Sequence, residues 1–573
     1  MSVAELEPVV QPVVPTGVAE ATALPLASPA LTVVGTALLL AACGGSDGSA
    51  PTPPPVPTPA PVPAPPTITP TGAARMLAQA TMGSTAGDIA RVQSLGFDAW
   101  LNEQFVTARA TAHWDWLVGA GFRDVANMNS ERGFDATVWR QLIGGSDQLR
   151  QRVGVGLLDF LVVGISGVSS GWNQFTVAAY LDILMDNAFG NFRTLLTQIS
   201  TNGAMGLFLT FLGNKKANPA TGSVPDENYA RELMQLFTLG LYKLNLDGSQ
   251  QLVGGQPVET YTQDDVSGLA RVFTGWTLDS TDNTTPDRYR RPMVQVAANH
   301  EPGVKTFLGT TIPAGTDGVT SLKLALDAIF AHPNVAPFVG KQLIQRLVTS
   351  NPSQAYVGRV STVFENNGSG VRGDLRAVVR AILLDPEARA DATAAAASSS
   401  GKLREPVMRL TAWARAFGAS SPSDAWTIGD TSSTATRLAE SIGRAPSVFN
   451  FFRPGYTPPS SAIATAGLVA PEFQITSEPT VVAYLNYMSA LIVNGAGDFK
   501  ADYTAILTKA ADSKALVDEV NLLLAGNAIG ADTLAQIRSA VDSISGATPA
   551  GLNNRVFTAI LLVLAAPEFL IVR

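Results

Sequence analysis

The chain has 573 residues, of which 46% are hydrophobic and 15% charged, with a net charge of −8 at pH 7 and one cysteine. This length and composition suffice for an ordinary hydrophobic core, whereas a single cysteine excludes a framework of internal disulfides. The acidic balance and the lack of a sizeable basic cluster argue against nucleic-acid binding, so we expect no nucleic-acid partner.

The single cysteine, Cys43, follows a run of apolar and small residues from Leu31 to Ala42. Such a run is too short to span a bilayer, which takes about 20 apolar residues, and has the length of the apolar part of a cleavable signal. The sequence therefore predicts a signal segment over residues 1–42 and lipidation of Cys43. The leader departs from the usual pattern because no Lys or Arg precedes Arg75. The alternative is a short apolar segment with an incidental buried cysteine.

Residues 43–70 are predicted to form a lipid-anchored, Pro-rich linker, as in the run from Pro51 to Pro55. Such a segment favours polyproline II, at about 3.1 Å per residue, and holds the following body away from its anchor. We therefore expect a protein of the cell envelope, anchored in a membrane and exposed outside the cytoplasm, in the periplasm or on the cell surface.

Residues 71–573 are predicted to be mainly α-helical, because apolar residues recur at spacings of three and four. We expect a large multi-helix body, built either as one domain or as two lobes. Helices are expected over residues 147–163, 174–201, 226–239, 262–276, 319–330, 335–349, 354–366, 374–384, 404–417, 481–493, 503–508, 513–524, 531–543 and 552–565.

A β-containing insert is expected over about residues 244–310, where Gly, Asp, Thr and Gln are frequent. Asp247-Gly248 is a strong turn signal. Short strands are predicted at 252–253, 258–260, 293–296 and 306–308. The sequence therefore predicts a small antiparallel sheet, or a pair of hairpins, within the helical body.

Seven stretches of the chain carry a family signature when they are taken together and in order. They are 225–240, 261–266, 270–276, 300–309, 332–338, 346–353 and 401–406. With them the chain, from about Arg75 to its C-terminus, resembles the bacterial "domain of unknown function 1800" family. The resemblance implies an exported or envelope-associated, largely helical protein without assigned chemistry. It also implies a partner, a co-encoded secreted protein of sulfatase-like type. Many members carry a His- and Trp-rich stretch early in the helical part, whereas residues 160–170 here are apolar and small.

A polar helix face is the first candidate site. Asn228, Arg231, Glu232 and Gln235 follow one another at i, i+3, i+4 and i+7, so they share one face of the predicted 226–239 helix. One arginine, one carboxylate and two amides can bind a polar ligand. The alternative is a buried polar network that fixes this helix to the insert.

The sequence around His300 is the second candidate site, with Glu301 and Lys305 close by in the chain. These residues can form a catalytic acid–base pair or part of a metal site. The alternative is a hairpin with polar edges. An HExxH helix is excluded because Pro302 follows Glu301. We expect no metal centre, and the sequence indicates no particular cofactor. The other histidines are expected on a helix surface (His113) and at a helix end (His332).

Two further stretches have mainly structural interpretations. Lys402, Arg404 and Glu405 are predicted to open a helix. The aromatic run over residues 449–456 either stacks on a sugar or a partner's prolines, or fills the core as a buried loop.

Two functions remain open at this point. The first is a tethered envelope protein that binds or assembles a secreted partner. The second is a hydrolase-like enzyme acting on an envelope or extracellular polymer through His300, Glu301 and the polar helix face. The second requires these side chains to meet in one open cleft.

Overall fold

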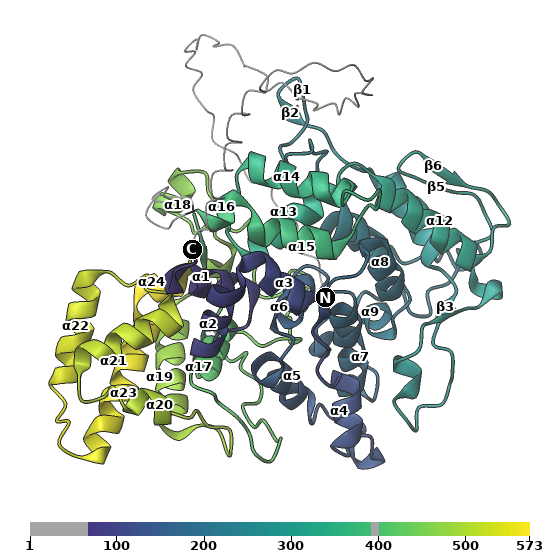
Figure 1. The fold of residues 1–573 in the computed structure, drawn as a ribbon. Coiled ribbons are helices and arrows are strands. Elements are labelled where there is room, and N and C mark those ends of the chain that lie inside the picture. The colour runs from purple at the N-terminus through teal and green to yellow at the C-terminus, as the bar shows by residue number, and fades with distance from the viewer. Residues whose placement is uncertain (1–66, 391–399) are drawn as a thin grey trace, which may run out of the picture. The chain divides into compact units, whose positions relative to one another are not determined.

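The computed structural model describes residues 67–390 and 400–573, and α-helices dominate them (Figure 1). The predicted signal segment, Cys43 and most of the 43–70 linker lie outside the described residues. The described residues belong to one compact unit, Pro66–Arg573. None of its helices is long and apolar enough to cross a membrane.

The N-terminal third of the unit is helical throughout. Its α2 begins with a capping box, in which Thr85 and Asp88 satisfy each other's main-chain N–H groups. The helices are α1 (Pro70–Ala80), α2 (Ala86–Leu95), α3 (Phe97–Val106), α4 (His113–Gly119), α5 (Phe134–Gly144), α6 (Gln148–Leu158), α7 (Asn173–Asp186), α8 (Phe192–Ser200) and α9 (Gly203–Phe208), with the 3₁₀ turns η1 (Val125–Asn127) and η2 (Ile165–Gly167).

The middle third carries the β insert between helices. Its helices are α10 (Asn228–Glu232), α11 (Gln263–Ala270), α12 (Gly318–Ala331), α13 (Val335–Leu347), α14 (Gln354–Glu365), α15 (Leu375–Leu384) and α16 (Pro386–Arg389). A π-helical turn, η3 (Leu233–Thr238), and the 3₁₀ turns η4 (Arg271–Phe273), η5 (Asp287–Tyr289) and η6 (Ala297–Asn299) complete it. Helix α14 packs against both α13 and α15.

The C-terminal third gathers helices α19 to α23 on one side of the unit (yellow in Figure 1). Its helices are α17 (Pro406–Ala416), α18 (Ala462–Thr465), α19 (Glu478–Asn494), α20 (Thr504–Leu507), α21 (Ser513–Val520), α22 (Ala531–Asp542), α23 (Pro549–Ala565) and α24 (Pro567–Leu570), with a 3₁₀ turn η7 (Pro471–Ile475) and a π-helical turn η8 (Asn521–Ala525).

The strands of the described residues form antiparallel pairs. The pairs are β1 (Leu252–Val253) with β2 (Gln256–Pro257), β3 (Trp276–Thr277) with β4 (Val294–Gln295), β5 (Lys305–Phe307) with β6 (Thr310–Ile312), and β7 (Lys402–Leu403) with β8 (Ile571–Val572). The first three confirm the predicted antiparallel insert in a helical body. The fourth joins the start of α17 to the C-terminus, a pairing that no local pattern indicates.

Most predicted helices are present, but several of them end early: the predicted 147–163 helix stops at Leu158, and the predicted 513–524 helix changes to the π turn η8 after Val520. The predicted 174–201 helix is two helices, because Asn191 caps α8 and donates through Nδ2 to the carbonyl of Arg372. The predicted 226–239 helix is a five-residue α10 followed by the π turn η3. The predicted 262–276 helix stops at Ala270, and Trp276 enters β3 after a left-handed Gly275.

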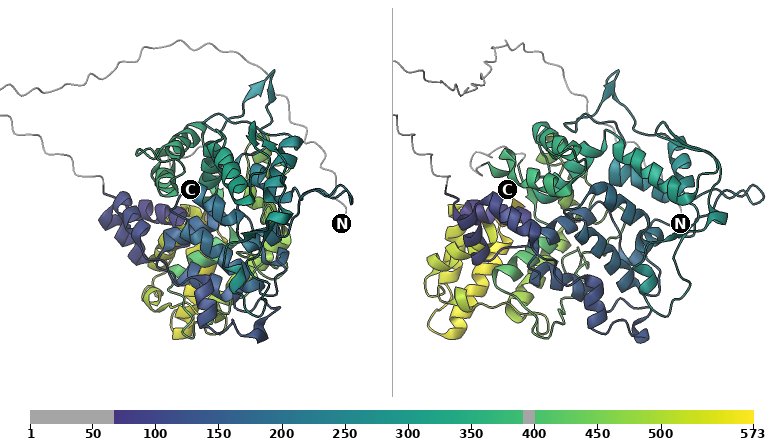
Figure 2. Two further views of the ribbon diagram at one scale, coloured as in Figure 1. Left: turned by 90° about the vertical axis from the view of Figure 1, so that its right-hand side faces the viewer. Right: turned by 45° about the vertical axis from the view of Figure 1, so that its right-hand side comes forward.

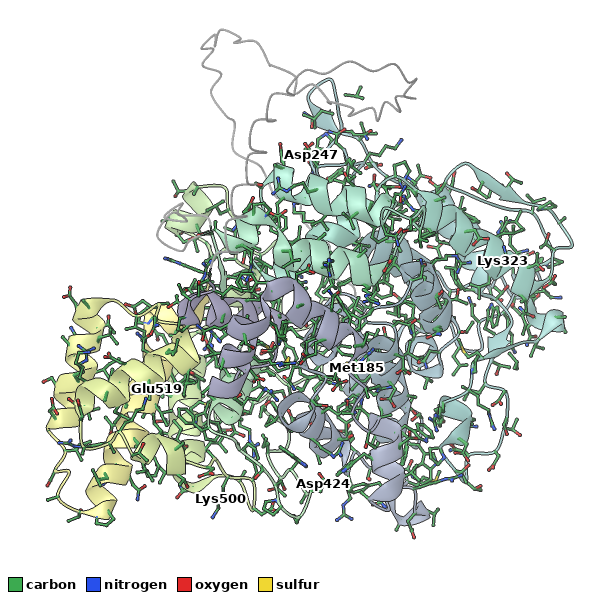
Figure 3. All side chains as sticks on the ribbon, in the orientation of Figure 1. Met185, Asp247, Lys323, Asp424, Lys500 and Glu519 are labelled. Atoms are coloured by element: carbon green, nitrogen blue, oxygen red, sulfur yellow. The ribbon has the colours of Figure 1, made fainter. Side chains whose placement is uncertain are left out.

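The hydrophobic core runs between the helices of all three thirds. Figure 3 shows side chains filling this space, with Met185 in the interior and Lys323 at the edge.

The side chain of His113 is buried, contrary to the prediction of a surface position. Its ring is 1% exposed, and Nδ1 lies 2.9 Å from a carboxylate oxygen of Asp182. His332 ends α12, as predicted.

Candidate functional site

His300 lies at the end of η6 and is held by the main chain of a neighbouring segment. Nδ1 donates to the main-chain oxygen of Thr274 over 3.0 Å. Nε2 is buried and has no hydrogen-bond partner among the described residues. Burial lowers the pKa of His300 because it disfavours the charged ring. The side chain is therefore a neutral imidazole fixed in one orientation.

Glu301 and Lys305 also bond to the main chain and not to His300. The Glu301 carboxylate accepts from the N–H groups of Ala217 (3.4 Å) and Gly303 (3.1 Å). Lys305 is completely buried, and its Nζ lies 3.4 Å from the carbonyl of Gly303. These contacts tie a turn together, and the predicted His300–Glu301 acid–base pair has no hydrogen bond between its two members.

The strand that carries Lys305 is pressed against α11. A Cβ on Gly268 of α11 would lie 1.7 Å from the carbonyl oxygen of Thr306, so only glycine permits this approach. Asp265 of the same helix accepts from the N–H of Leu308 over 2.6 Å. The His300 turn is therefore supported by rigid packing.

On the polar helix face, Arg231 is bound by its neighbours. Its Nη2 donates to Glu227 (3.2 Å) and to Gln263 of α11 (3.0 Å). Gln235 accepts from the hydroxyl of Tyr261 over 3.0 Å. Asn228 donates from its main chain to Asp226 and from Nδ2 to Thr210, a contact of 3.4 Å. Three of the four predicted ligand-binding residues therefore join α10 to adjacent segments.

Glu232 is the exception on this face. It is 9% exposed, and its Oε2 is buried without a hydrogen-bond partner among the described residues. Burial raises the pKa of Glu232 to about 7, and Arg231 offsets part of this effect. The carboxyl is thus a buried acidic group whose charge is only partly compensated.

The two candidate groups contact the same loop, which runs over residues 214–217. Asn214 bonds to the main chain of both Asp226 and Gly275, while Ala217 in the same loop bonds to Glu301. None of the seven candidates lines any of five hollows on the described chain. In residues 67–390 and 400–573, no group of three or more His, Cys, Asp or Glu is placed to hold a metal ion.

The most unusual electrostatic feature is a set of ionisable side chains buried together, which we call the buried charge network. All its members are at most 6% exposed: Arg152, Asp159, Arg346, Lys402, Glu405, Glu440 and Glu472. They come from α6, α13, β7, the start of α17, a loop and η7. The sequence predicted a structural role for Lys402 and Glu405, but no local pattern indicated that the other five residues are buried beside them.

Lys402 is the central cation of the network. Its Nζ lies 2.7 Å from Glu405 and 3.0 Å from Glu472, and it donates to the carbonyl of Arg346 over 2.9 Å. Arg346 is completely buried, with its Nε 3.7 Å from Asp159. The Phe452 ring lies 5.6 Å from the Arg346 guanidinium, so this part of the aromatic run fills the core.

The carboxyls of the network differ in acidity. Burial, with the nearby charge of Glu405, raises the pKa of Asp159 to about 7 and that of Glu440 well above its usual range. Burial also opposes ionisation of Glu405, but Lys402 and Arg152 outweigh it and lower the pKa of Glu405. Such contrasts occur at functional sites and in structural ion networks alike. No described hollow is lined by a network member, which favours the structural role here.

Comparison with known proteins identifies a family without an assigned reaction. No curated protein and no solved structure matches the chain. A family model matches residues 75–571, close to the range over which the sequence signature was found. The chain therefore belongs to the family described as "Protein of unknown function (DUF1800)".

Proposed function

We propose that this protein is a lipid-anchored protein of the cell envelope that binds a second secreted protein and does not itself catalyse a reaction. The partner is a co-encoded secreted protein of sulfatase-like type, as the family resemblance implies. Cys43 provides the anchor, and the Pro-rich linker gives the helical body its reach.

The observation that carries this proposal is an exposed apolar surface on the insert. Residues 241–259, which we call the apolar hairpin, contain β1 and β2, and bridges join Tyr242 to Glu259 and Leu244 to Gln250. Leu252 is 58% exposed and Val253 is 73% exposed, and Leu241, Tyr242 and Leu246 are exposed as well. Figures 1 and 2 show β1 and β2 projecting from the helices. Several exposed apolar side chains on one short segment are typical of a protein-binding surface.

The conformation of the apolar hairpin is fixed at its turn and at its base. Gly254 and Gly255 both have positive φ, at 61° and 82°, as the favoured two-residue hairpin turns require. Asn334, at the start of α13, donates to the carbonyls of Leu239 and Tyr242 and so fixes the base of the hairpin. The surface is therefore presented on an ordered support.

The candidate catalytic groups support binding over catalysis. His300, Glu301 and Arg231 use their side chains to join segments of the fold, as described above. A general acid or base must reach its substrate within hydrogen-bond distance. These side chains line none of the five described hollows, so the geometry favours a scaffold.

Replacing Leu252 and Val253 by serine is expected to reduce capture of the sulfatase-like partner by about tenfold, because apolar anchors carry most of the energy of an interface. The measurement is pull-down of the tagged full-length protein from envelope fractions, with the partner identified by mass spectrometry. Val481 and Val482 on α19, at 44% and 58% exposure, give a matched serine control that should capture normally. Equal capture by both variants would contradict the role of the hairpin.

A Cys43→Ser protein is expected to leave the membrane fraction and to lose palmitate labelling, because the thiol is the proposed site of lipid attachment. Fractionation of cells after metabolic labelling tests this. The hairpin variant serves as the control, since it should remain labelled and membrane-bound. A Cys43→Ser protein that still sediments with membranes would refute the lipid anchor while leaving partner binding open.

A further inference from the structure

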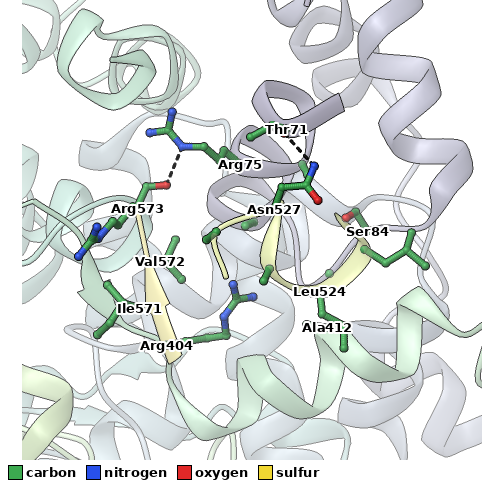
Figure 4. A pocket seen from close by; sticks show the side chains of 17 residues that line it. Thr71, Arg75, Ser84, Arg404, Ala412, Leu524, Asn527, Ile571, Val572 and Arg573 are labelled. Atoms are coloured by element: carbon green, nitrogen blue, oxygen red, sulfur yellow. Dashed lines mark hydrogen bonds between the residues drawn. The ribbon is translucent and has the colours of Figure 1, made fainter. Parts of the chain in front are cut away.

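A hollow between the two ends of the helical body has the properties of a ligand site. It encloses about 310 Å³ and lies between α1, η8, β8 and the residues around Arg404 (Figure 4). Its apolar lining is contributed by Ala74, Ala78, Ala412, Leu523, Leu524, Ile571 and Val572. Asn527 and Ala528 on its rim are exposed, so the hollow reaches the surface.

Arg404 places a buried positive charge in this hollow. The residue is 6% exposed, its Nε donates to the carbonyl of Phe569 over 3.1 Å, and its guanidinium lies 4.5 Å from the centre of the Phe569 ring. Nη1 and Nη2 have no hydrogen-bond partner among the described residues. Figure 4 shows the guanidinium pointing between Leu524 and Val572. The Nε of the guanidinium is thus held by the main chain, while Nη1 and Nη2 are available to bind a ligand.

Arg404 has no ion-pair partner within hydrogen-bond distance among the described residues. The side chains around the hollow include no Asp or Glu. Burial lowers the pKa of Arg404 to about 10; Tyr484 opposes this shift, and the cations Arg409 and Arg152 add to it. An arginine in an interior place normally has a carboxylate partner. Arg404 lacks such a partner, so its charge is open to pairing with an anionic ligand.

Two other polar side chains at the rim, those of Arg75 and Asn527, are already engaged. Arg75 donates from Nε to the main-chain oxygen of Arg573 over 3.1 Å and from Nη1 to the carbonyl of Ala390 over 2.8 Å. Asn527 donates to the hydroxyl of Thr71 over 3.0 Å. These contacts shape the entrance, and Arg404 is the buried cation in the lining.

We infer that this hollow binds a small carboxylic acid with an apolar body, whose carboxylate pairs with Nη1 and Nη2 of Arg404. One guanidinium edge matches one planar carboxylate through two parallel hydrogen bonds. The leucine, isoleucine, valine and alanine side chains accept the apolar part, as in most small-molecule sites. The π turn η8, a feature often found at functional sites, supplies Leu523 and Leu524 to the wall.

This inference does not depend on the anchor or on the apolar hairpin. It is tested by calorimetric titration of the full-length protein with hexanoate, compared with the neutral hexanamide and with acetate. Hexanoate is expected to bind at least about tenfold more tightly than either, because only hexanoate offers both the charge and the apolar chain. Binding of hexanoate no tighter than hexanamide, or no heat at about 10 mM hexanoate, would overturn the proposal.

Two variants separate the site from general stability. Arg404→Met removes the charge and Ala78→Leu fills the hollow from α1, and each is expected to weaken hexanoate binding by about tenfold or more. Ala90→Leu on α2, an exposed alanine outside the lining, is the control and should bind normally. If Arg404→Met does not fold, Ala78→Leu decides. A folded Ala78→Leu protein that binds hexanoate like the wild type would overturn the site.

Discussion

Replacing Lys402 by methionine is expected to destabilise the folded protein by about 3–5 kcal/mol, the cost of removing one partner from a buried ion pair. Lys402 lies within 3.0 Å of both Glu405 and Glu472, and all three side chains are at most 2% exposed. Without the ammonium group, two buried carboxylates face each other in a region that already contains Asp159 and Glu440. The free energy of unfolding, measured by urea titration at pH 7, gives the effect.

An exposed lysine provides the matched comparison. Lys514 pairs with Asp518 one helical turn away, and its side chain is 71% exposed. Lys514→Met should cost less than about 0.5 kcal/mol, because exposed ion pairs contribute little. The penalty for Lys402→Met should also shrink as the pH falls, because protonation neutralises the stranded carboxylates. A loss below about 1 kcal/mol at pH 7 would mean that Lys402 is not essential to the network.

Replacing Glu232 by glutamine is expected to stabilise the protein by about 3 kcal/mol above pH 7 and to have little effect below pH 4.5. Burial raises the pKa of Glu232 from 4.5 to about 7, so between these values the folded state holds a proton that the unfolded state has released. Wild-type stability therefore falls by about 1.4 kcal/mol per pH unit through this window on account of Glu232. Glutamine removes this contribution to the slope. Urea unfolding at several pH values measures it.

Glu227, five residues earlier, provides a control of opposite sign. Burial opposes its ionisation, but hydrogen bonds from Ser267 and Gln263 and the charge of Arg231 lower the pKa of Glu227. Its stabilising contribution is present above pH 4.5 and is lost in acid, so Glu227→Gln should be less stable at neutral pH. A Glu232→Gln protein with the wild-type pH slope would contradict the assignment.

The Glu232 variant also separates the two candidate functions. A carboxyl with a pKa near 7 suits a general acid, and this is the observation that favours a hydrolase. The binding protein that we propose should keep its partner and its cellular phenotype when Glu232 is replaced by glutamine. A stable, folded Glu232→Gln protein that captures its partner but loses the phenotype would favour the enzyme.

Local signals predicted most of the fold. The apolar periodicity predicted the ends of α12, α13 and α14 to within one or two residues. Thr262 and Asp265, three residues apart in the sequence, form the capping box that begins α11, close to the predicted start of that helix. The turn residues of the insert predicted short antiparallel strands. These features depend on neighbouring residues, which is why a single sequence reveals them.

The polar helix face could not be predicted with the same success. The predicted face assumed that the α-helix continues through residues 226–239, but the chain changes to a π turn at Leu233. Asn228, Arg231 and Glu232 precede the turn in α10, so the change affects where Gln235 lies relative to them. Glu232 is buried by packing against segments that are distant in the sequence. No residue type marks a π turn, because it is fixed by how the segment packs on its neighbours.

The sequence by itself determined the helical class, the antiparallel insert and the family, because periodicity, caps, turns and ordered motifs are local. It also predicts the lipidated Cys43, which cell fractionation can test. Only the tertiary structure decided which charges are buried together. Arg152 and Glu472 are 320 positions apart in the chain, yet both belong to the network around Lys402. Burial and electrostatic pairing depend on distances in space, and those exist only once distant segments have packed against one another.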